Sequence, residues 1–321
     1  MSKPGASRPW NTPSPCPMPS GMSSCVASKP EPVLICGTGA LATLFAARLS
    51  AACIRVTMLG SWPEAIAALN RDGARLGDDV YPVRAVSDPR ECQGAGLALV
   101  LVKAWQTERS ARQLAECLAE DGIAVSLQNG LGNRETLAAH LSPSRVKQAV
   151  TTLGATLLGP GQVRFGGEGV ISLEAAPALD VLAAHLTESG LRVERVEAIE
   201  SLVWGKLVIN TAINPLTALF KIPNGKLLES PPAREMMAAL ARETAVVAAL
   251  QGVSLPFADP LAAVEAVAQR TATNHSSMLQ DVLRGAPTEI DAICGAVARL
   301  GGEKAPLNRA MWQLVKALGS W

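Results

Sequence analysis

The sequence feature that most constrains the fold is a glycine-rich turn between an apolar run and a helical pattern. Residues 33–36 read VLIC, residues 37–42 read GTGALA, and a helical run continues to about residue 51. A strand, a glycine turn and a helix in this order match the G-x-G-x-x-G/A fingerprint of dinucleotide-binding folds. There the backbone approaches a pyrophosphate, which binds at the helix N-terminus. The candidate cofactor-binding residues are Gly37, Thr38, Gly39, Ala40, Leu41 and Ala42.

A second predicted strand, residues 54–59, ends where the adenosine ribose of such a cofactor should lie. An Asp or Glu there would bind the ribose 2′-hydroxyl, and an Arg would bind a 2′-phosphate. The sequence instead continues with Gly60, Ser61 and Trp62, while the nearest acid is Glu64 and a later cation is Arg71. The choice between NAD and NADP therefore stays open from these residues.

Two further predicted strands, residues 97–102 and 123–127, are followed by polar side chains. Lys103 follows the first strand, and Asn129 lies just beyond the second. Ligands of open α/β sheets lie beyond the carboxyl ends of the strands. Lys103 and Asn129 are therefore candidate cofactor-binding residues, although ordinary loop polarity would give the same pattern.

The order of the elements predicts two domains. Short β-like runs over residues 145–173 predict antiparallel strands added to the sheet, and beyond residue 198 only helical patterns occur. A chain of 321 residues is long enough for two domains. We therefore expect an α/β fold, with an N-terminal Rossmann-type dinucleotide-binding domain over residues 31–197 and an all-α C-terminal domain over residues 198–321.

Residues 1–30 are excluded from this predicted fold. They hold seven of the 22 prolines, several serines and no acid, which is typical of a disordered tail. A start codon placed too far upstream would explain them equally well. An amphipathic targeting helix is not compatible with so many prolines.

Composition argues against several classes of function. A net charge of +1 without long runs of one sign provides no surface for nucleic acid or an anionic membrane. No apolar run reaches the ~18 residues that a membrane-spanning helix needs. Seven scattered cysteines without a C-x-x-C pair predict free thiols in a reducing compartment, hence a cytoplasmic protein. The three histidines have no cysteine at ligand spacing, so no metal site is expected.

An unusual helical pattern lies in residues 201–219, SLVWGKLVINTAINPLTAL. Lys206, Asn210 and Asn214 recur at intervals of four, which places all three on one face of a helix. That face is either solvated or lines a cleft. A cleft is a real alternative because asparagine is a poor helix former and is uncommon on exposed faces. Pro215 disfavours helical geometry at Asn214, so the helix is expected to end or kink there.

Two later segments carry polar residues with good structural explanations. Residues 274–281 read NHSSMLQD, in which Ser277 and Gln280 fit a capping box. Residues 288–291 read TEID, and Glu289 suits the start of another helix after a proline. His275 is expected to be an ordinary loop histidine.

Taken together, these motifs resemble one protein family. GTGALA, VKAWQ, QNGLGN, WGKLVINTAINPLTA and NHSSMLQDVLRGAPTEID resemble, in this order, the motifs of ketopantoate reductase (2-dehydropantoate 2-reductase). The resemblance runs from about residue 33 to the last predicted helix. It implies a Rossmann domain, a helical domain and an active site between them. It also implies reduction of 2-dehydropantoate to (R)-pantoate with NADPH, on the path to pantothenate and coenzyme A.

The resemblance implies roles for single residues. Lys206 matches the catalytic lysine, while Lys103 and Asn129 match residues of the cofactor and substrate cleft. A lysine whose pKa is lowered by burial is a suitable acid for the alkoxide that forms during hydride transfer. The implied substrate-binding residues are Asn210, Asn214, Asn274, Ser277 and Glu289.

One departure from the family pattern concerns the cofactor. Ser61 stands where the family often has an Arg for the 2′-phosphate. Either another cation such as Arg71 replaces that Arg, or the preference for NADPH is weakened and NADH remains a candidate. Ser61 is therefore included among the candidate cofactor-binding residues.

Alternative functions remain open. A paralogue would reduce another branched 2-oxo acid, and Glu289 separates the two readings because it is expected to bind the distal hydroxyl of 2-dehydropantoate. A dehydrogenase with a histidine acid would need an acidic partner that the sequence does not show for His275. A nucleotide-sensing module would have no reason to carry both Lys206 and Glu289. The Ala- and Leu-rich helical half could also bury a homodimer interface.

Overall fold

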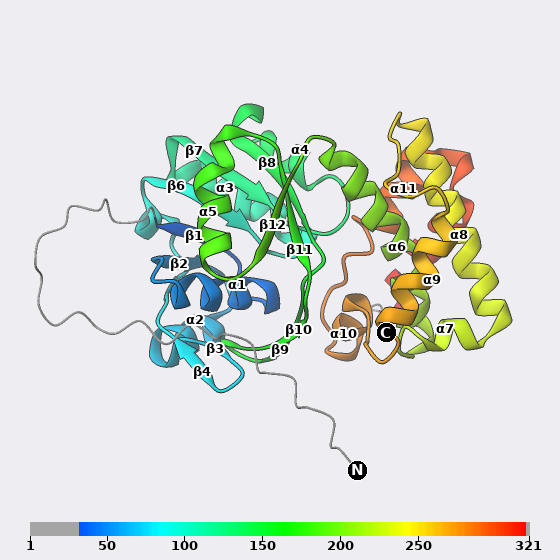
Figure 1. The fold of residues 1–321 in the computed structure, drawn as a ribbon, viewed down its shortest axis with the longest axis horizontal. Helices are drawn as coiled ribbons and strands as arrows, with labels where there is room; N and C mark the ends of the chain where they lie inside the picture. Colours follow the sequence, from blue (N-terminus) through cyan, green and yellow to red (C-terminus); the bar gives the residue numbers. More distant parts are fainter. Residues whose placement is uncertain (1–31, 319–321) are drawn as a thin grey trace, which may run out of the picture.

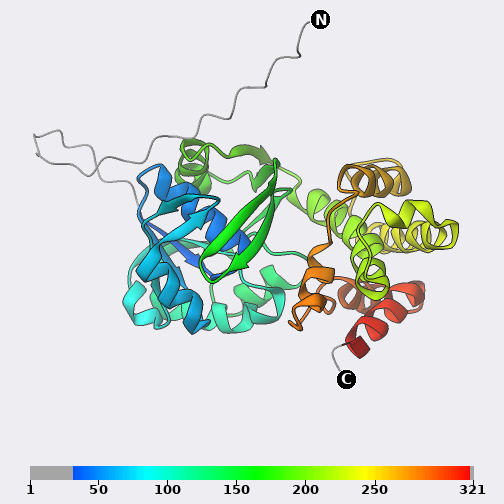
Figure 2. The same ribbon diagram turned by 90° about the horizontal axis from the view of Figure 1, so that it is seen from below.

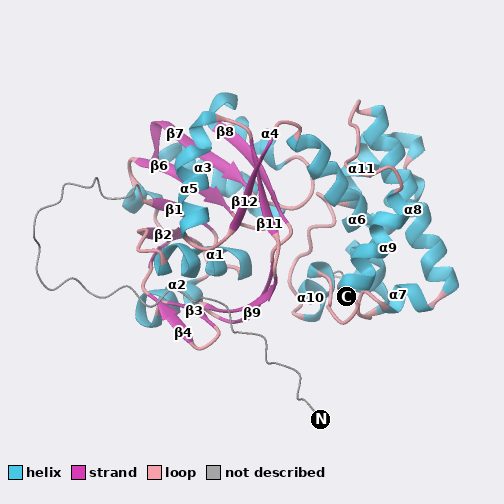
Figure 3. Ribbon diagram, viewed as in Figure 1, coloured by secondary structure: helices cyan, strands magenta, loops and turns pink. Residues whose placement is uncertain are grey.

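A computed structural model describes residues 32–318, so the predicted tail, residues 1–30, lies outside the described residues. The described chain forms two halves of different construction (Figure 1). Strands occur only in the first half, and the second half is helical (Figure 3). The predicted fold class, a Rossmann-type α/β half followed by an all-α half, is confirmed.

The first half contains all the described strands. They are β1 (Val33–Cys36), β2 (Val56–Leu59), β3 (Ala74–Leu76), β4 (Asp79–Tyr81), β5 (Arg84–Val86), β6 (Ala95–Val100), β7 (Leu118–Ser126), β8 (Val146–Thr151), β9 (Gly154–Gly159), β10 (Gln162–Gly167), β11 (Val170–Glu174) and β12 (Arg192–Val196). Its helices are α1 (Ala40–Ala51), α2 (Pro63–Asp72), η1 (Pro89–Cys92), η2 (Ala104–Gln106), α3 (Thr107–Cys117), α4 (Asn133–Ala138), η3 (Pro143–Arg145), η4 (Pro177–Leu179) and α5 (Asp180–Glu188).

The second half is built from helices that pack around a core of their own. They are α6 (Ile199–Phe220), α7 (Lys226–Glu229), α8 (Pro231–Leu250), α9 (Pro260–Arg270), α10 (Ser277–Leu283), α11 (Cys294–Gly301), η5 (Gly302–Lys304) and α12 (Pro306–Leu318). The helix α10 lies between the sheet and the rest of these helices (Figure 2).

The main sheet has eight strands in the order β12-β11-β8-β7-β6-β1-β2-β5. The strand β1 is fully buried and pairs in parallel with β2 on one side and with β6 on the other. The chain thus winds outward in both directions from β1, and β6, β7 and β8 are also parallel. The carboxyl ends of β1, β6 and β7 consequently meet at one edge of the sheet, where this topology binds ligands.

The strands predicted within residues 145–173 do not all join this sheet. Only β11 is added to it in antiparallel fashion, against β8. The antiparallel pair β9 and β10 forms a second sheet with β3 and β4, in the order β4-β3-β10-β9. The expectation was therefore wrong for β9 and β10, because β10 pairs with β3 from far earlier in the chain. It was also wrong for the direction of β8, which joins the main sheet parallel to β7.

The helix α6 continues through Pro215 to Phe220. Of the two expectations for Asn214, an end or a kink, the end was therefore wrong, and the kink stays a prediction. A proline inside a helix costs about 3 kcal/mol. Ile213, Leu216 and their neighbours are almost fully buried on this helix, and each such side chain contributes about 1.5–3 kcal/mol. The packing of α6 in the core therefore outweighs the local preference of its proline.

The described residues also bear on the expectations about membrane-spanning helices and free cysteines. Within residues 32–318 no helix has the length and apolar character that crossing a bilayer requires. Cys36, Cys92, Cys117 and Cys294 are free, as expected, and all four are buried. Cys53 is disulfide-bonded, so the prediction of free thiols was wrong at that position.

Candidate active site

The glycine turn after β1 is built for the close approach of a ligand to the backbone. Gly37 has a φ of +126°, and a Cβ there would lie 3.2 Å from the carbonyl carbon of Leu101. At Gly39, by contrast, a Cβ would meet nothing within 4 Å, so the space over the start of α1 is open. No side chain of the described residues caps this helix end. Its free N–H groups fit the phosphates of a dinucleotide.

The loops that follow β6 and β7 are held together by side-chain amides. The Gln128 amide donates to the Val102 carbonyl over 3.0 Å and to the Thr107 hydroxyl over 2.7 Å. The Asn133 amide donates to the carbonyl of Asn129 over 3.0 Å. These bonds fix the backbone on both sides of Lys103 and Asn129, which the sequence placed at these strand ends.

The loop after β7 also contacts the helical half directly. Gly130 has a φ of +80°, and a Cβ there would lie 2.4 Å from the carbonyl oxygen of Ala292. The next residue, Leu131, donates its N–H to the same oxygen over 2.9 Å. Ala292 belongs to a turn that also carries Glu289. The expectation of a helix starting at Glu289 was wrong, because α11 begins only at Cys294.

Four charged and polar groups meet where the two halves touch. The Lys103 ammonium lies 2.6 Å from the Asp281 carboxylate and 3.5 Å from the Glu289 carboxylate. Glu289 also accepts hydrogen bonds from the Ala104 N–H over 3.1 Å and from the Asn129 amide over 3.2 Å. Both carboxylates are more than nine-tenths buried. Groups that are separated by up to 186 residues in the chain, as Lys103 and Glu289 are, thus form one cluster.

The pKa values in this cluster report its burial and its charges. Burial lowers the pKa of Lys103, but the Glu289 and Asp281 carboxylates raise it by more than burial lowers it. The pKa of Lys103 therefore lies above its ordinary value. Burial raises the pKa of Asp281, and the Lys103 ammonium offsets only part of that effect. Lys103 is therefore a permanent cation at neutral pH.

Lys206 lies on α6, near enough to Glu289 for that carboxylate to affect its pKa. Its ammonium donates a hydrogen bond to the carbonyl oxygen of Thr151 over 2.8 Å. Burial lowers the pKa of Lys206 to about 8, against an opposing effect of the Glu289 carboxylate. A lysine with this pKa exchanges a proton near neutral pH, which is the property that a general acid needs.

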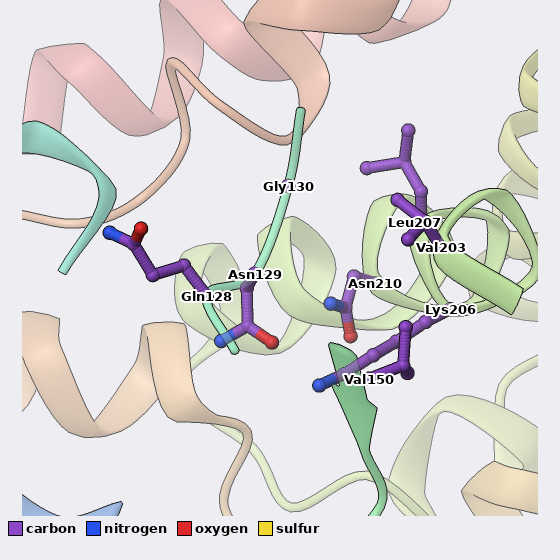
Figure 4. Close-up of a pocket in the computed structure, with 8 residues that line it drawn as sticks. All are labelled: Gln128, Asn129, Gly130, Val150, Val203, Lys206, Leu207 and Asn210. Carbon is purple, nitrogen blue, oxygen red and sulfur yellow. The ribbon is translucent and has the colours of Figure 1, made fainter. Parts of the chain in front are cut away.

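A pocket forms around Lys206 between the two halves. Its lining residues are Gln128, Asn129, Gly130, Val150, Val203, Lys206, Leu207 and Asn210. The amides of Asn129 and Asn210 and the ammonium of Lys206 point toward one common space, whereas the Gln128 side chain points away from it (Figure 4). The cleft interpretation of the α6 polar face therefore holds for Lys206 and Asn210.

The other predicted substrate residues lie farther along α6 and α10. Asn214 is buried on α6, whereas Asn274 and Ser277 are exposed around the start of α10. The predicted capping box of Ser277 and Gln280 was wrong, because Ser276 caps α10 by accepting from the N–H of Leu279, a residue whose side chain cannot complete such a box. These three residues are not in the lining of the pocket around Lys206.

Ser276 joins the two helices that carry the predicted substrate residues. Its hydroxyl lies 2.7 Å from that of Thr217 on α6. The Thr217 hydroxyl also donates to the carbonyl of Asn214, three residues before it. The start of α10, with Ser277, is thereby tied to the last part of α6.

The structure separates Ser61 from its suggested substitute Arg71. Ser61 precedes α2, whereas Arg71 lies in the last turn of that helix. Eight residues of helix separate Pro63 from Arg71, which is about 12 Å. Arg71 is also bound on two of its nitrogens by Asp72. These contacts do not support the suggestion that Arg71 replaces the missing Arg beside Ser61, and the suggestion stays a prediction.

Sequence reasoning missed three parts of this site. Asp281 was visible in the NHSSMLQD segment, but nothing local distinguishes it from an ordinary helix residue. The bonds of Gln128 follow from the close approach of β6 and β7. The acceptor for Lys206 is the main-chain oxygen of Thr151, which no residue type encodes.

Comparison with known proteins bears on these observations. Residues 33–178 match the family model described as "Ketopantoate reductase PanE/ApbA", and residues 198–319 match "Ketopantoate reductase PanE/ApbA C terminal". The 2-dehydropantoate 2-reductase of Archaeoglobus fulgidus is 36% identical over 299 residues, covering 90% of this chain and 98% of that protein. The chain belongs to the ketopantoate reductase family.

Solved structures of similar fold agree with this membership. A PanE/ApbA family ketopantoate reductase from Ralstonia eutropha JMP134 is 32% identical, with a TM-score of 0.84 over 90% of this chain and 98% of that one. A D-mandelate dehydrogenase solved in complex with NADH is 25% identical, with a TM-score of 0.83 over 90% and 98% of the two chains. The ketopantoate reductase fold thus also occurs in a protein named for another substrate.

Proposed function

We propose that this chain is a 2-dehydropantoate 2-reductase, which transfers a hydride from NADPH to the 2-keto group of 2-dehydropantoate and forms (R)-pantoate. The observation that carries the proposal is Lys206, a lysine with a pKa of about 8 that faces the Asn129 and Asn210 amides in a pocket between the two halves. Membership of the family supports it, as does a relative of that name at 36% identity.

Lys206 acts in this proposal as the proton donor. A bound reduced nicotinamide would supply the hydride. The hydrogen bond to the Thr151 carbonyl orients the Lys206 ammonium toward the pocket. From there Lys206 protonates the oxygen on which the negative charge develops. The Asn210 amide orients the carbonyl group without adding charge. Asn214, buried one turn farther along α6, would support this face from behind the pocket.

The remaining residues bind the two ends of the substrate. Asn274 and Ser277 hold the carboxylate, and Glu289 accepts a hydrogen bond from the distal hydroxyl. In the ligand-free cleft both Glu289 oxygens already have protein donors, Ala104 and Asn129 among them. A carboxylate has about four acceptor sites, so the substrate hydroxyl either adds a bond to Glu289 or replaces one of these donors.

The cofactor proposal rests on the glycine turn. Residues 37–42 would hold the phosphates, Ser61 would lie at the adenosine ribose, and Lys103 and Asn129 would lie at the nicotinamide end. A nicotinamide dinucleotide is supported by the family and by the related dehydrogenase that binds NADH. NADPH is proposed by resemblance to the family, and NADH is the alternative because Ser61 provides no cation.

A second candidate is a reductase of another branched 2-oxo acid that lacks the distal hydroxyl. The observation in its favour is that both Glu289 oxygens are already engaged by protein groups, so that the protein itself stabilises this carboxylate without a substrate hydroxyl. The D-mandelate dehydrogenase of similar fold is an example of a different substrate on this framework. The homodimer and the cytoplasmic location stay predictions.

The test mixes the purified full-length chain with 2-dehydropantoate and follows the loss of NADPH absorbance, with NADH in parallel. Rapid consumption of NADPH is expected. Preference for NADH would keep the reaction and assign the change to Ser61. If neither is oxidised although the protein binds a dinucleotide, the proposed substrate is wrong and other 2-oxo acids take its place.

A further inference from the structure

Asp281 is a charged residue of the cleft to which no role has been given so far. It lies on α10 in the helical half, and its side chain is only 8% exposed. Its carboxylate reaches across to Lys103, which follows β6 in the sheet half, over 2.6 Å. A buried carboxylate is tolerated only when it is paired, and Lys103 is the cation that pairs it. This ion pair bridges the two halves of the molecule.

The Lys103 ammonium is shared unequally between two carboxylates. It lies 2.6 Å from Asp281 but 3.5 Å from Glu289. The other donors to Glu289 are neutral groups, the Ala104 N–H at 3.1 Å and the Asn129 amide at 3.2 Å. A charge-assisted hydrogen bond is roughly twice as strong as a neutral one. Glu289 is therefore held mainly by bonds that another neutral donor can replace.

Removal of the Asp281 charge would change how the Lys103 ammonium is shared between the two carboxylates. Lys103 would keep Glu289 as its partner, and Glu289 is only 4% exposed. Opposite charges attract strongly in such a buried site, where the effective dielectric constant is low. The Lys103 ammonium would therefore form a direct ion pair with the Glu289 carboxylate. A substrate hydroxyl would then compete with a direct ion pair instead of a neutral amide.

We propose that Asp281 is a positioning residue that holds the Lys103 ammonium away from Glu289 and so keeps Glu289 able to accept the distal hydroxyl of the substrate. This inference rests on the proposed function of Glu289. It makes Asp281 a determinant of specificity, because it affects only substrates that carry that hydroxyl.

The first experiment compares two substrates in the Asp281→Asn variant at saturating cofactor. One is 2-dehydropantoate, and the other is 3,3-dimethyl-2-oxobutanoate, in which a methyl group replaces the hydroxymethyl group. The KM for 2-dehydropantoate is expected to rise by about tenfold, the scale of one hydrogen bond to a charged group. The kcat for that substrate and the KM for the methyl analogue are expected to stay near their wild-type values.

Glu265→Gln is the matched control for this experiment. Glu265 pairs with Arg234 over 2.6 Å, as Asp281 does with Lys103, but this pair lies on the outer helices α8 and α9. It is expected to leave both KM values unchanged. A rise of the KM for both substrates in Asp281→Asn would mean a merely structural role and would overturn the proposal, as would no rise for either.

The second experiment needs no substrate. A crystal structure of the ligand-free Asp281→Asn variant is expected to show the Lys103 ammonium within about 3 Å of the Glu289 carboxylate, the usual length of such a bond, in place of the present 3.5 Å. If Lys103 instead keeps its place or turns to solvent, the positioning role is wrong. Should the wild-type chain reduce neither substrate, the proposed function fails, and this distance still decides the inference.

Discussion

The glycine turn and the cleft around Lys206 are two sites of opposite construction. The turn is formed by one contiguous segment, residues 37–42, and offers backbone groups with open space above Gly39. The cleft combines the pocket lined by Lys206 with the neighbouring cluster of Lys103, Asp281 and Glu289, and Asn129 belongs to both. Its charged side chains come from four separate segments. The turn is thus fixed by local sequence, whereas the cleft exists only when the two halves dock.

The two sites also differ in what their charges do. The cleft holds two cations and two carboxylates. The desolvation of each such group costs several kcal/mol, and ion pairing offsets this penalty. Stability alone does not explain their presence, since apolar residues would serve at least as well. The glycine turn, in contrast, has no charged side chain of its own. Disruption of the cleft should therefore affect chemistry first, and disruption of the turn should affect cofactor binding first.

The largest effect is expected for Lys206→Ala, which should reduce turnover but leave cofactor binding intact. Lys206→Ala removes the proposed proton donor and should lower kcat by on the order of 10²-fold or more, the usual scale for a general acid. Dinucleotide affinity, measured by titration calorimetry, should stay near wild type because the glycine turn is untouched. Lys226→Ala, at an exposed lysine paired with Glu229, is the control. Near-normal turnover without Lys206 would contradict the mechanism.

The next effect concerns the docking of the two halves. In Gly130→Ala a methyl group would lie 2.4 Å from the Ala292 oxygen, so the turn that carries Glu289 must shift. A displacement of about 1 Å near the chemistry can cost up to 10²-fold, so a loss of kcat/KM between tenfold and hundredfold is expected.

Gly132→Ala is a matched control for that variant. Gly132 also has a positive φ, +90° against +80°, but a Cβ there meets nothing within 4 Å. Both variants carry a similar backbone strain of about 1–2 kcal/mol, which thermal unfolding would measure. Only Gly130→Ala should lose activity, and equal losses in the two variants would assign the effect to strain.

The pH dependence of the reaction tests the environment of Lys206. Its pKa is lowered to about 8, so the donor ammonium is present below that pH and is lost above it. The kcat/KM for ketone reduction should therefore be flat below about pH 8 and fall to roughly a tenth one unit higher. Glu289→Gln removes the carboxylate that raises this pKa, so the fall should begin at lower pH. A flat profile up to pH 10 would exclude Lys206 as the donor.

The smallest effect concerns the ribose end of the cofactor. Ser61→Arg supplies the cation that the family often has at this place and should raise the preference for NADPH over NADH by about tenfold or less, the scale of one exposed charged contact. Arg71→Ala should leave the ratio of the two dissociation constants unchanged, since Arg71 lies at the far end of α2. If Arg71→Ala instead weakens the preference for NADPH over NADH, Arg71 takes part in binding the 2′-phosphate.

Much of the fold was predictable because its signals are local. The apolar run of β1, the turn at Gly37 and the start of α1 follow one another directly in the chain. The change from strands to helices beyond residue 198 also appears in the structure. The parts that the sequence did not predict depend on distant contacts. The second sheet needs β10 to pair with β3, and α6 passes through Pro215 because of its buried neighbours.

In the candidate site, too, the residues with local signals were predictable and the contacts between distant residues were not. The motifs identified Lys206, Glu289, Lys103 and Asn129, and the structure brings all four to one region. The partnership of Lys103 with a carboxylate on α10 joins residues 178 positions apart, so no periodic pattern reveals it. Equally, the Thr151 carbonyl is a backbone group whose position only the fold determines. Sequence thus predicts which groups are present but not how their charges are shared.

The desolvation of Lys206 has a consequence for chemical labelling. With a pKa of about 8, the amine is neutral in roughly one molecule in five at pH 7.4, against about one in a thousand for an ordinary lysine with a pKa near 10.4. Neutral amines are the species that acylating reagents attack. Limited acylation should therefore modify Lys206 ahead of exposed lysines wherever the reagent fits the pocket, which makes this side chain a handle for covalent ligands that target the cleft.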